Sequence, residues 1–222
     1  MIEAPEARIL CRQLNETVRG KKITDVYTQF SPHKFAWFTG SADEYAGWLS
    51  GKTIDHAQPQ GGMVEITIGD KVLVLTDGVN LRYLSPGTKL PAKHQLLIAF
   101  EDESCLIASV RMYGGMMCYD KDATAGTLSE YYLTAKSKPQ VMSDDFTKEY
   151  FLGLINAESA QKKSAKAFLA TGQTIPGLGN GVLQDILYHT RIHPKKKIAG
   201  LTDKEKENLF YQVKETMNDL YL

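Results

Sequence analysis

Residues 175–194 read IPGLGNGVLQDILYHTRIHP and predict a tight loop that runs directly into a helix. Gly177 and Gly179 allow the backbone to take a positive φ or to approach another segment closely. The apolar residues that follow have the spacing of one buried helix face: Val182, Leu183, Ile186 and Leu187. Free N–H groups at the start of such a helix favour anions, so the loop indicates a phosphate site.

The same loop has a second interpretation that needs no ligand. It is compatible with a tight turn between two helices, with Asn180 as the N-cap of the second helix. The stretch contains neither a G-x-G-x-x-G pattern nor a Gly-Lys-Ser/Thr sequence, so it matches no common nucleotide-binding motif. The loop alone leaves a phosphate site and a helix–helix turn both open.

Basic residues surround this loop. From Gln161 to Lys197 there are seven basic residues and one acid, Asp185, a local net charge of +6 in a chain with 26 basic and 26 acidic residues. The seven are Lys162, Lys163, Lys166, Arg191, Lys195, Lys196 and Lys197. Such a cluster around an anion site is typical of proteins that bind nucleic-acid phosphates. For the run 195–197 alone, a solvated basic face is the alternative.

Several further segments occur in the order found in one known family. They are MIEAPE at 1–6, KKI at 21–23, GKTI at 51–54, GVNLRY at 78–83, VRMYG at 110–114 and IHP at 192–194. With the loop, which resembles a helix–two-turn–helix motif, they resemble the formamidopyrimidine-DNA glycosylase and endonuclease VIII family over most of the chain. The resemblance implies a DNA-repair enzyme that binds damaged double-stranded DNA, flips a base and cleaves its N-glycosidic bond.

The resemblance assigns the chemistry to the N-terminus. In the family, the initiator methionine is removed, the amine of the next residue, a proline, attacks C1′ of the damaged nucleoside, and β-elimination cuts the strand. An α-amine gives up its proton more readily than a lysine side chain, which suits Schiff-base formation. Glu3 matches the family's proton-transferring glutamate and Glu6 its second acidic position. Without the family, Glu3 is an acid that favours the first turn of a helix.

Ile2 stands where the family has its proline. Because methionine removal needs a small second residue, a bulky Ile2 leaves Met1 in place. The terminal amine then lies one residue, up to about 3.5 Å, from its usual place, and such a displacement is costly in rate. Three outcomes stay open. Ile2 becomes the N-terminus and its amine is the nucleophile, the amine of Met1 is the nucleophile, or the lyase step is lost.

The resemblance also implies contacts to the DNA backbone. Lys166, in the first helix of the motif, and Asn180, at the start of the second, match the family's phosphate ligands. Gly177 and Gly179 match the turn between those helices. These four residues are the expected contacts to the DNA backbone.

Other predicted DNA contacts lie in the first half of the chain. By the resemblance, Arg111 and Tyr113 fill the space left by a flipped base, with Val79 at the third such position. Tyr113 is otherwise an aromatic of the core or of a sheet edge. Where the family has a phosphate-binding lysine at a hairpin tip, this chain has Gly61 and Gly62, whose backbone N–H groups are expected to replace it.

The pattern predicts an α+β fold, with a β-rich first half and a helical second half. A helix is expected at 4–19, followed by strands at 23–27, 63–68, 72–75, 81–83, 96–100, 106–110 and 116–119. The alternation in 63–68 predicts a half-buried strand. We expect a β-sandwich or barrel with a leading helix at 1–125, a linker at 126–144 and an all-α helix–two-turn–helix domain at 145–222.

The bulk composition fits a globular protein, with 43% hydrophobic residues. No run of about 18 apolar residues exists and the N-terminus has no apolar segment, so we expect no membrane partner. A cytoplasmic, nucleoid-associated monomer is expected. The three cysteines form no C-x-x-C pair, so neither a disulfide framework nor a metal site is expected. Zinc is expected only if the family's C-terminal zinc ribbon follows residue 222.

Three functions follow from these observations. The first is a DNA glycosylase with AP lyase activity. The second is a protein that binds lesions or abasic sites without catalysis, which Ile2 and the missing hairpin lysine favour. The third is an RNA- or ribosome-binding protein, because a small-subunit ribosomal protein also contains a helix–two-turn–helix. The MIEAPE start and the RMYG turn argue against the third.

Overall fold

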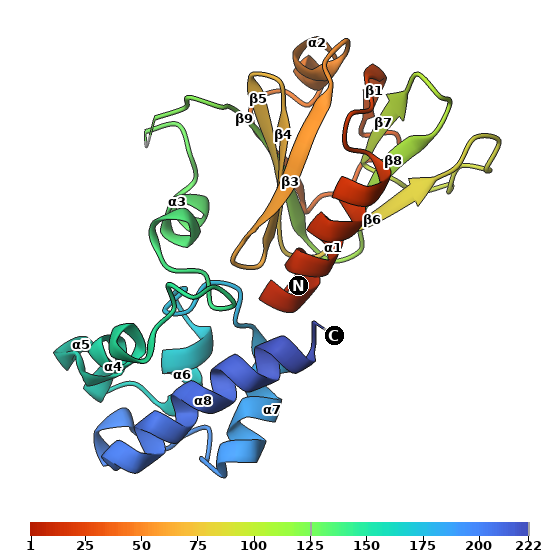
Figure 1. Cartoon of the computed structure of the whole chain (residues 1–222). Coiled ribbons are helices and arrows are strands. Elements are labelled where there is room, and N and C mark those ends of the chain that lie inside the picture. Colours follow the sequence, from red (N-terminus) through yellow and green to blue (C-terminus); the bar gives the residue numbers. More distant parts are fainter. Residues whose placement is uncertain (125, 222) are drawn as a thin grey trace. The chain divides into compact units, whose positions relative to one another are not determined.

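The computed structural model describes residues 1–124 and 126–221. Ala125, the last residue of the expected first domain, and Leu222, the expected end of the last helix, lie outside the described residues. The chain forms two compact units, shown in Figure 1. The β unit comprises residues 1–2, 8–59 and 63–128, and the helical unit comprises residues 3–7, 60–62 and 129–222. The predicted α+β fold is confirmed.

The β unit contains two sheets, as in the predicted sandwich. The four-stranded sheet has the order β1 (Ile23–Thr28), β7 (Leu96–Phe100), β8 (Cys105–Val110), β6 (Val79–Leu84). The five-stranded sheet has the order β2 (Ala36–Phe38), β9 (Gly114–Asp120), β5 (Lys71–Leu75), β4 (Met63–Ile68), β3 (Ile54–Gln60). All seven expected strands are present. The additional β2 is only three residues long, and β3 is largely polar, so neither has a clear strand pattern.

Helix α1 (Ala4–Thr17) packs against the five-stranded sheet, whereas α2 (Glu44–Leu49) was not predicted. The Asn15 side chain donates to the carbonyl of Ala57 at 2.8 Å and accepts from its N–H at 2.7 Å. The prediction of a half-buried strand at 63–68 is wrong, because all six residues of β4 are buried. Glu65 is buried beside Cys11 of α1 and accepts from Gln58 Nε2 at 2.6 Å.

The helical unit is built from short capped helices. They are α3 (Glu130–Ser137), α4 (Lys148–Asn156), α5 (Glu158–Gln161), α6 (Ala165–Ala170), α7 (Asn180–Thr190), the 3-10 turn Ile198–Gly200 and α8 (Asp203–Asp219). A capping box of Thr202 and Glu205 begins α8. Helix α3 lies within the expected linker at 126–144. The Ser129 hydroxyl caps α3 by accepting from the Tyr132 N–H.

Aromatic rings form the centre of the helical unit. Phe151 packs edge-on against Phe168 with ring centroids 5.9 Å apart, and Phe146 stacks on Phe210 at 6.2 Å. In the β unit, the cysteines are free and buried. Burial raises the pKa of the Cys11 thiol to about 12, which keeps it protonated and unreactive. No helix among the described residues is long and apolar enough to cross a membrane.

The double hydrogen bond of Asn15 generates a stability prediction. Asn15→Ala leaves the backbone groups of Ala57 without this partner, so the β unit loses about 1–3 kcal/mol of unfolding free energy. Chemical unfolding followed by tryptophan fluorescence measures the loss, because Trp37 and Trp48 both lie in the β unit. Gln13→Ala, on an exposed position of the same helix, is the matched control. Equal unfolding midpoints for the two variants would contradict the prediction.

Candidate nucleic-acid interface

The predicted loop and helix start are present, and their glycines are required by packing. Gly177 has a φ of +81°, which favours glycine. A Cβ at Gly177 would lie 2.5 Å from the carbonyl carbon of Gly61 and 2.8 Å from the Cβ of Ala4. The Ala4 N–H also donates to the carbonyl of Gly177 at 2.8 Å. Residues 3–7 and 60–62 therefore pack against this loop within the helical unit.

The carboxylate of Glu3 caps the N-terminus of α7. Its Oε1 accepts from the Gly181 N–H at 2.8 Å, and its Oε2 accepts from the Val182 N–H at 2.9 Å. A Cβ at Gly179 would lie only 2.2 Å from Glu3 Oε1, so this position has room for glycine alone. The backbone at Gly179 is extended, with a φ of −102°, so the constraint is steric and not conformational.

This cap changes both sequence-based interpretations of the loop. Gly179, and not Asn180, is the N-cap residue of α7, and the capping side chain comes from Glu3. The helix start does hold an anion, as the loop pattern indicated, but the anion belongs to the chain itself. The N–H groups of Gly181 and Val182 are therefore not available to a DNA phosphate.

Glu6 serves the start of α1. Its Oε2 accepts from the Glu3 N–H at 2.9 Å, which satisfies a backbone donor ahead of the first helical turn. Glu3 thus contributes its backbone to one helix start and its side chain to another. Glu6 has a capping contact in this structure, and its expected catalytic role stays a prediction.

The Gly61 N–H, one of the two N–H groups expected to bind DNA, already has a partner within the chain. Both glycines are buried. The Gly61 N–H donates to Gln140 Oε1 at 2.5 Å, and a Cβ at Gly61 would lie 2.7 Å from the Cβ of Pro176. The hairpin tip is glycine-rich because it packs against the loop before α7.

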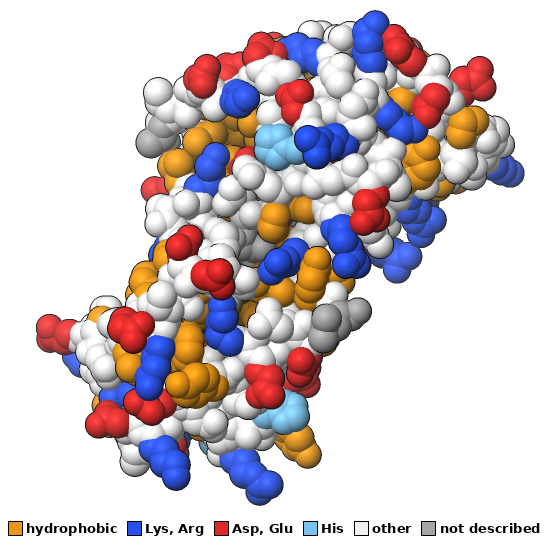
Figure 2. All heavy atoms as spheres, in the orientation of Figure 1, with side chains coloured by type: hydrophobic (Ala, Val, Ile, Leu, Met, Phe, Trp, Pro, Cys, Tyr) orange, Lys and Arg blue, Asp and Glu red, His pale blue; other side chains and the backbone are white. Residues whose placement is uncertain are grey.

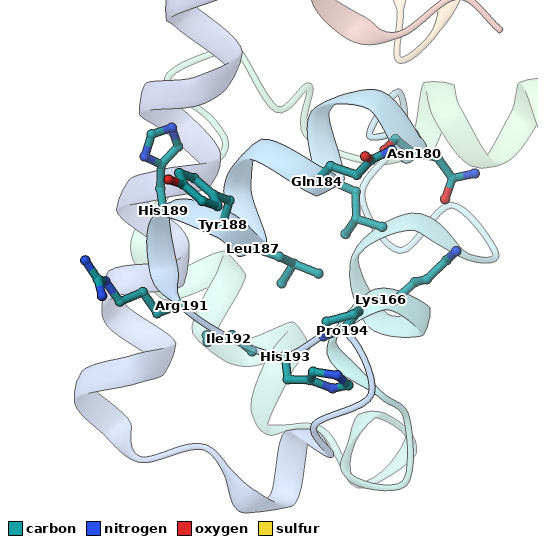
Figure 3. Close-up of a pocket in the computed structure, with 11 residues that line it drawn as sticks. Lys166, Asn180, Gln184, Leu187, Tyr188, His189, Arg191, Ile192, His193 and Pro194 are labelled. Carbon is teal, nitrogen blue, oxygen red and sulfur yellow. The ribbon is translucent and has the colours of Figure 1, made fainter.

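Two of the four expected backbone contacts, Lys166 and Asn180, line a hollow beside α7, shown in Figure 3, whereas Gly177 and Gly179 do not. The hollow has a volume of about 970 Å³. Lys166 from α6 and Asn180 from α7 are exposed and extend toward the same side, with Leu187 between them and the Tyr188 end of the helix. Arg191 ends α7 in a left-handed conformation, with a φ of +56°. The arrangement joins cationic and amide donors to an apolar floor, which suits a phosphate with its attached sugar.

The basic residues near the loop divide into paired and exposed groups. Lys196 pairs with Glu205 at 2.7 Å, and this hydrogen bond lowers the pKa of the Glu205 carboxyl. Lys197 donates to the carbonyl of Lys162 at 2.9 Å. Lys166, Arg191 and Lys195 are exposed. Figure 2 shows basic and acidic side chains interspersed over the face that it draws, consistent with the balanced total charge.

In the β unit, the three residues predicted to fill a flipped-base site differ in exposure. Arg111 and Tyr113 are exposed in the turn between β8 and β9. Val79 is buried, and its Cγ2 lies 2.8 Å from where a Cβ on Gly114 would be. The prediction for Val79 is therefore not supported, because a core side chain does not reach a DNA duplex in this conformation.

The two candidate nucleophiles at the N-terminus also differ in exposure. Ile2 has 7% of its surface exposed, and its N–H donates to the carbonyl of Asp77 at 2.6 Å. Met1 is 54% exposed. Met1 is therefore the exposed residue of the two, and the backbone nitrogen of Ile2 is engaged with Asp77.

Two residues of the interface were missed by the sequence analysis. Gln140 lies in the expected linker, where nothing in the local sequence indicates its contact with Gly61. Tyr188 lies on the polar side of the α7 pattern and is exposed beside the hollow. Helical periodicity could have predicted that exposure. Among residues 1–124 and 126–221, no group of His, Cys, Asp or Glu side chains has the arrangement of a metal site.

Comparison with known proteins relates this geometry to one enzyme family. No protein-family model matches the chain. Over 222 residues the chain is 28% identical to the formamidopyrimidine-DNA glycosylase of Shouchella clausii, covering 99% of this chain and 77% of that protein. The chain is thus similar in sequence, over nearly its whole length, to formamidopyrimidine-DNA glycosylases. The glycosylase of Streptococcus pneumoniae strain R6 is 25% identical over 209 residues, covering 92% of this chain and 72% of that protein.

Solved structures of glycosylases have the same fold. Lactococcus lactis Fpg in complex with DNA that contains an abasic site has a TM-score of 0.83 and 22% identity, covering 99% of this chain and 79% of that chain. MutM in complex with DNA that contains carbocyclic 8-oxo-G has a TM-score of 0.82 and 22% identity, covering 98% and 80%. The resemblance to this glycosylase family that the sequence predicted is confirmed.

The cap on α7 generates a second prediction. Gly179→Ala places a methyl group on the Glu3 carboxylate and expels it from the helix start, which costs about 1–3 kcal/mol of unfolding free energy. Gly153→Ala is the matched control, because its Cβ meets no atom within 4 Å and lies inside α4, where alanine is the better helix former. Thermal unfolding of the two variants tests this. A Gly179→Ala protein as stable as wild type would show that the cap contributes little.

Proposed function

We propose that the chain is a DNA-repair glycosylase that binds damaged double-stranded DNA and releases the damaged base. The observation that carries the proposal is homology to formamidopyrimidine-DNA glycosylases over nearly the whole chain. The related solved structures are complexes with DNA that contains an abasic site or a damaged base. The reported relatives are glycosylases, which favours this function over RNA or ribosome binding.

Binding is proposed to rest on side chains around α7. Lys166 contributes a cation and Asn180 an amide, and both are exposed at the hollow. Because Glu3 takes the N–H groups of Gly181 and Val182, the side chains have to supply most of the attraction for a phosphate. Contacts of this kind set the position on the duplex and are independent of base sequence.

The role of Lys166 is testable by the salt dependence of binding. Lys166→Ala weakens binding to every DNA sequence, and the slope of log affinity against log salt becomes shallower by about one, the amount for one lost phosphate contact. Lys204→Ala, an exposed lysine in the first turn of α8, is the control and keeps the wild-type slope. Fluorescence anisotropy at several salt concentrations measures both. An unchanged slope for Lys166→Ala would refute its assignment.

For the chemistry, we propose the amine of Met1 as the nucleophile. Its nitrogen attacks C1′ of the damaged nucleoside, and the base leaves with the electron pair of the N-glycosidic bond. Met1 is exposed, whereas Ile2 is buried and its nitrogen is bonded to Asp77. Glu3, which follows Ile2, is held in place by the N-terminus of α7. Its carboxylate is the proposed group for proton transfer.

A second candidate function is recognition of abasic sites without catalysis. The burial of Ile2 favours it, because the position that carries the nucleophile in related enzymes is occupied by a core side chain. In that case the chain binds the lesion and forms no covalent intermediate. The two functions predict the same affinity for DNA and opposite results in a trapping experiment.

Borohydride trapping on DNA with an abasic site separates the two functions. The glycosylase–lyase proposal predicts a covalent adduct whose mass places the DNA on Met1. Glu3→Gln lowers the rate of base release about 10²-fold or more, as expected for loss of a proton-transfer group. Glu16→Gln, which alters an exposed acid of α1 without a proposed role, is the matched control. Tight binding with neither an adduct nor base release would establish the non-catalytic alternative.

A further inference from the structure

The β unit exposes a cluster of large apolar side chains that the proposed chemistry does not use. Its members, here called the aromatic surface, are Phe35, Trp37, Met112 and Tyr113, with exposed fractions of 46%, 43%, 73% and 40%. Single exposed apolar residues are common, whereas a contiguous group marks an interaction site. Its composition points to ring stacking, because three of the four side chains are aromatic.

Backbone pairing brings these residues together. Strand β2 pairs in parallel with β9, so that Trp37 lies opposite Gly115. The Gly114 N–H donates to the carbonyl of Phe35 at 3.0 Å. The rings of Trp37 and Tyr113 lie 6.2 Å apart between centroids and are tilted by 41°. The aromatic surface is therefore part of the five-stranded sheet and its adjoining turns.

Close backbone packing fixes the turn that carries Tyr113. The Gly78 N–H donates to the carbonyl of Tyr113 at 3.1 Å, and a Cβ at Gly78 would lie 2.6 Å from that oxygen. A Cβ at Gly114 would lie 3.0 Å from the nitrogen of Val79. The site is thus preorganised, which reduces the entropy lost when a ligand binds.

The segments that build this end of the β unit are basic and contain no acid. Residues 29–40, 78–95 and 110–118 have no Asp or Glu, although the chain has 26 acids in all. A hollow of about 490 Å³ is lined by the exposed cations Arg82, Lys93 and Arg111, together with His33. His33 also packs edge-on against Phe35, with centroids 6.3 Å apart, so the basic hollow and the aromatic surface adjoin.

We propose that this site binds unpaired nucleotides of a DNA strand. The bases stack on Trp37 and Phe35, and the phosphates lie against Arg82 and Lys93. Base faces are covered by their neighbours in a duplex and become available when nucleotides are unpaired. Stacking on aromatic rings beside a cationic groove is the usual mode of single-strand binding. The inference rests on the proposed DNA-repair function and names its preferred substrate: lesions within or beside an unpaired stretch.

The positive charge around this site favours a nucleic acid over an apolar protein segment as its ligand. Lys34 lies 5.4 Å from the ring centre of Phe35, so a cation is present even on the apolar side of the site. An apolar partner gains nothing from an acid-free basic rim, whereas a DNA strand releases counterions from its phosphates on binding.

The test compares three DNAs that carry or lack an abasic-site analogue. They are a fully paired duplex with the analogue, the same duplex with about five unpaired nucleotides beside it, and an undamaged oligothymidylate of about ten nucleotides, a common single-strand site size. The wild-type protein binds the second DNA about tenfold tighter than the first. Trp37→Ala and Phe35→Ala remove this difference, about the loss expected for one stacked base, and leave paired-duplex binding unchanged.

Three variants serve as controls. Trp37→Phe keeps an aromatic ring and retains the preference, which separates stacking from a folding defect. Tyr27→Ala removes another exposed aromatic of the β unit and has no effect. Trp48→Phe leaves Trp37 as the single tryptophan of the chain, and oligothymidylate then quenches its fluorescence.

The outcomes distinguish this inference from the function on which it rests. If Trp37→Ala and Phe35→Ala bind the unpaired DNA as tightly as wild type, or if Trp37 fluorescence is not quenched, the inference is wrong. Paired-duplex binding that depends on Lys166 then still stands. If the wild-type protein binds none of the three DNAs, the proposed function fails as well.

Discussion

The carboxylate of Glu3 on the first turn of α7 is the interaction on which the helical unit depends. It meets two backbone N–H groups within 2.9 Å, and hydrogen bonds to an ionised acceptor are among the stronger ones in proteins. The field of the helix adds to the attraction. A residue with a proposed role in proton transfer is therefore fixed by the same helix that presents Asn180. The Glu3 side chain thus links the packing of α7 to the proposed proton transfer.

The glycines of the site follow from this contact. Gly179 leaves room for the Glu3 carboxylate, and Gly177 leaves room for Gly61 and Ala4. A glycine-rich loop before a helix has the appearance of a phosphate cradle, yet here the space is filled by the chain's own backbone and carboxylate. Lys166 and Asn180 remain exposed beside the hollow, so a cation and an amide are still available to a phosphate. The nucleic-acid recognition proposed at α7 thus rests on side chains.

The sequence predicted the elements well and their contacts poorly, for physical reasons. Periodicity located α7 and seven of the nine strands among the described residues, because burial of one face is a local signal. It failed at β4, where α1 covers the face that alternation assigned to water, so Glu65 is buried. It also failed for Gly61 and Gly62, whose partners Gln140 and Pro176 are distant in the chain. The roles of Glu3 and Lys166 came from family resemblance, because no spacing pattern joins positions so far apart.

The composition of the helical unit has a consequence for how the protein is made. The unit includes residues 3–7 and 60–62 together with 129–222. The ribosome therefore releases Glu3 long before α7 exists, and the N–H groups of Gly181 and Val182 acquire their partner only when nearly the whole chain has emerged. Contacts of such sequence separation slow folding, because a long loop has to close before they form. A fragment that begins at residue 129 contains every helix from α3 to α8 and still lacks the side chain that completes α7.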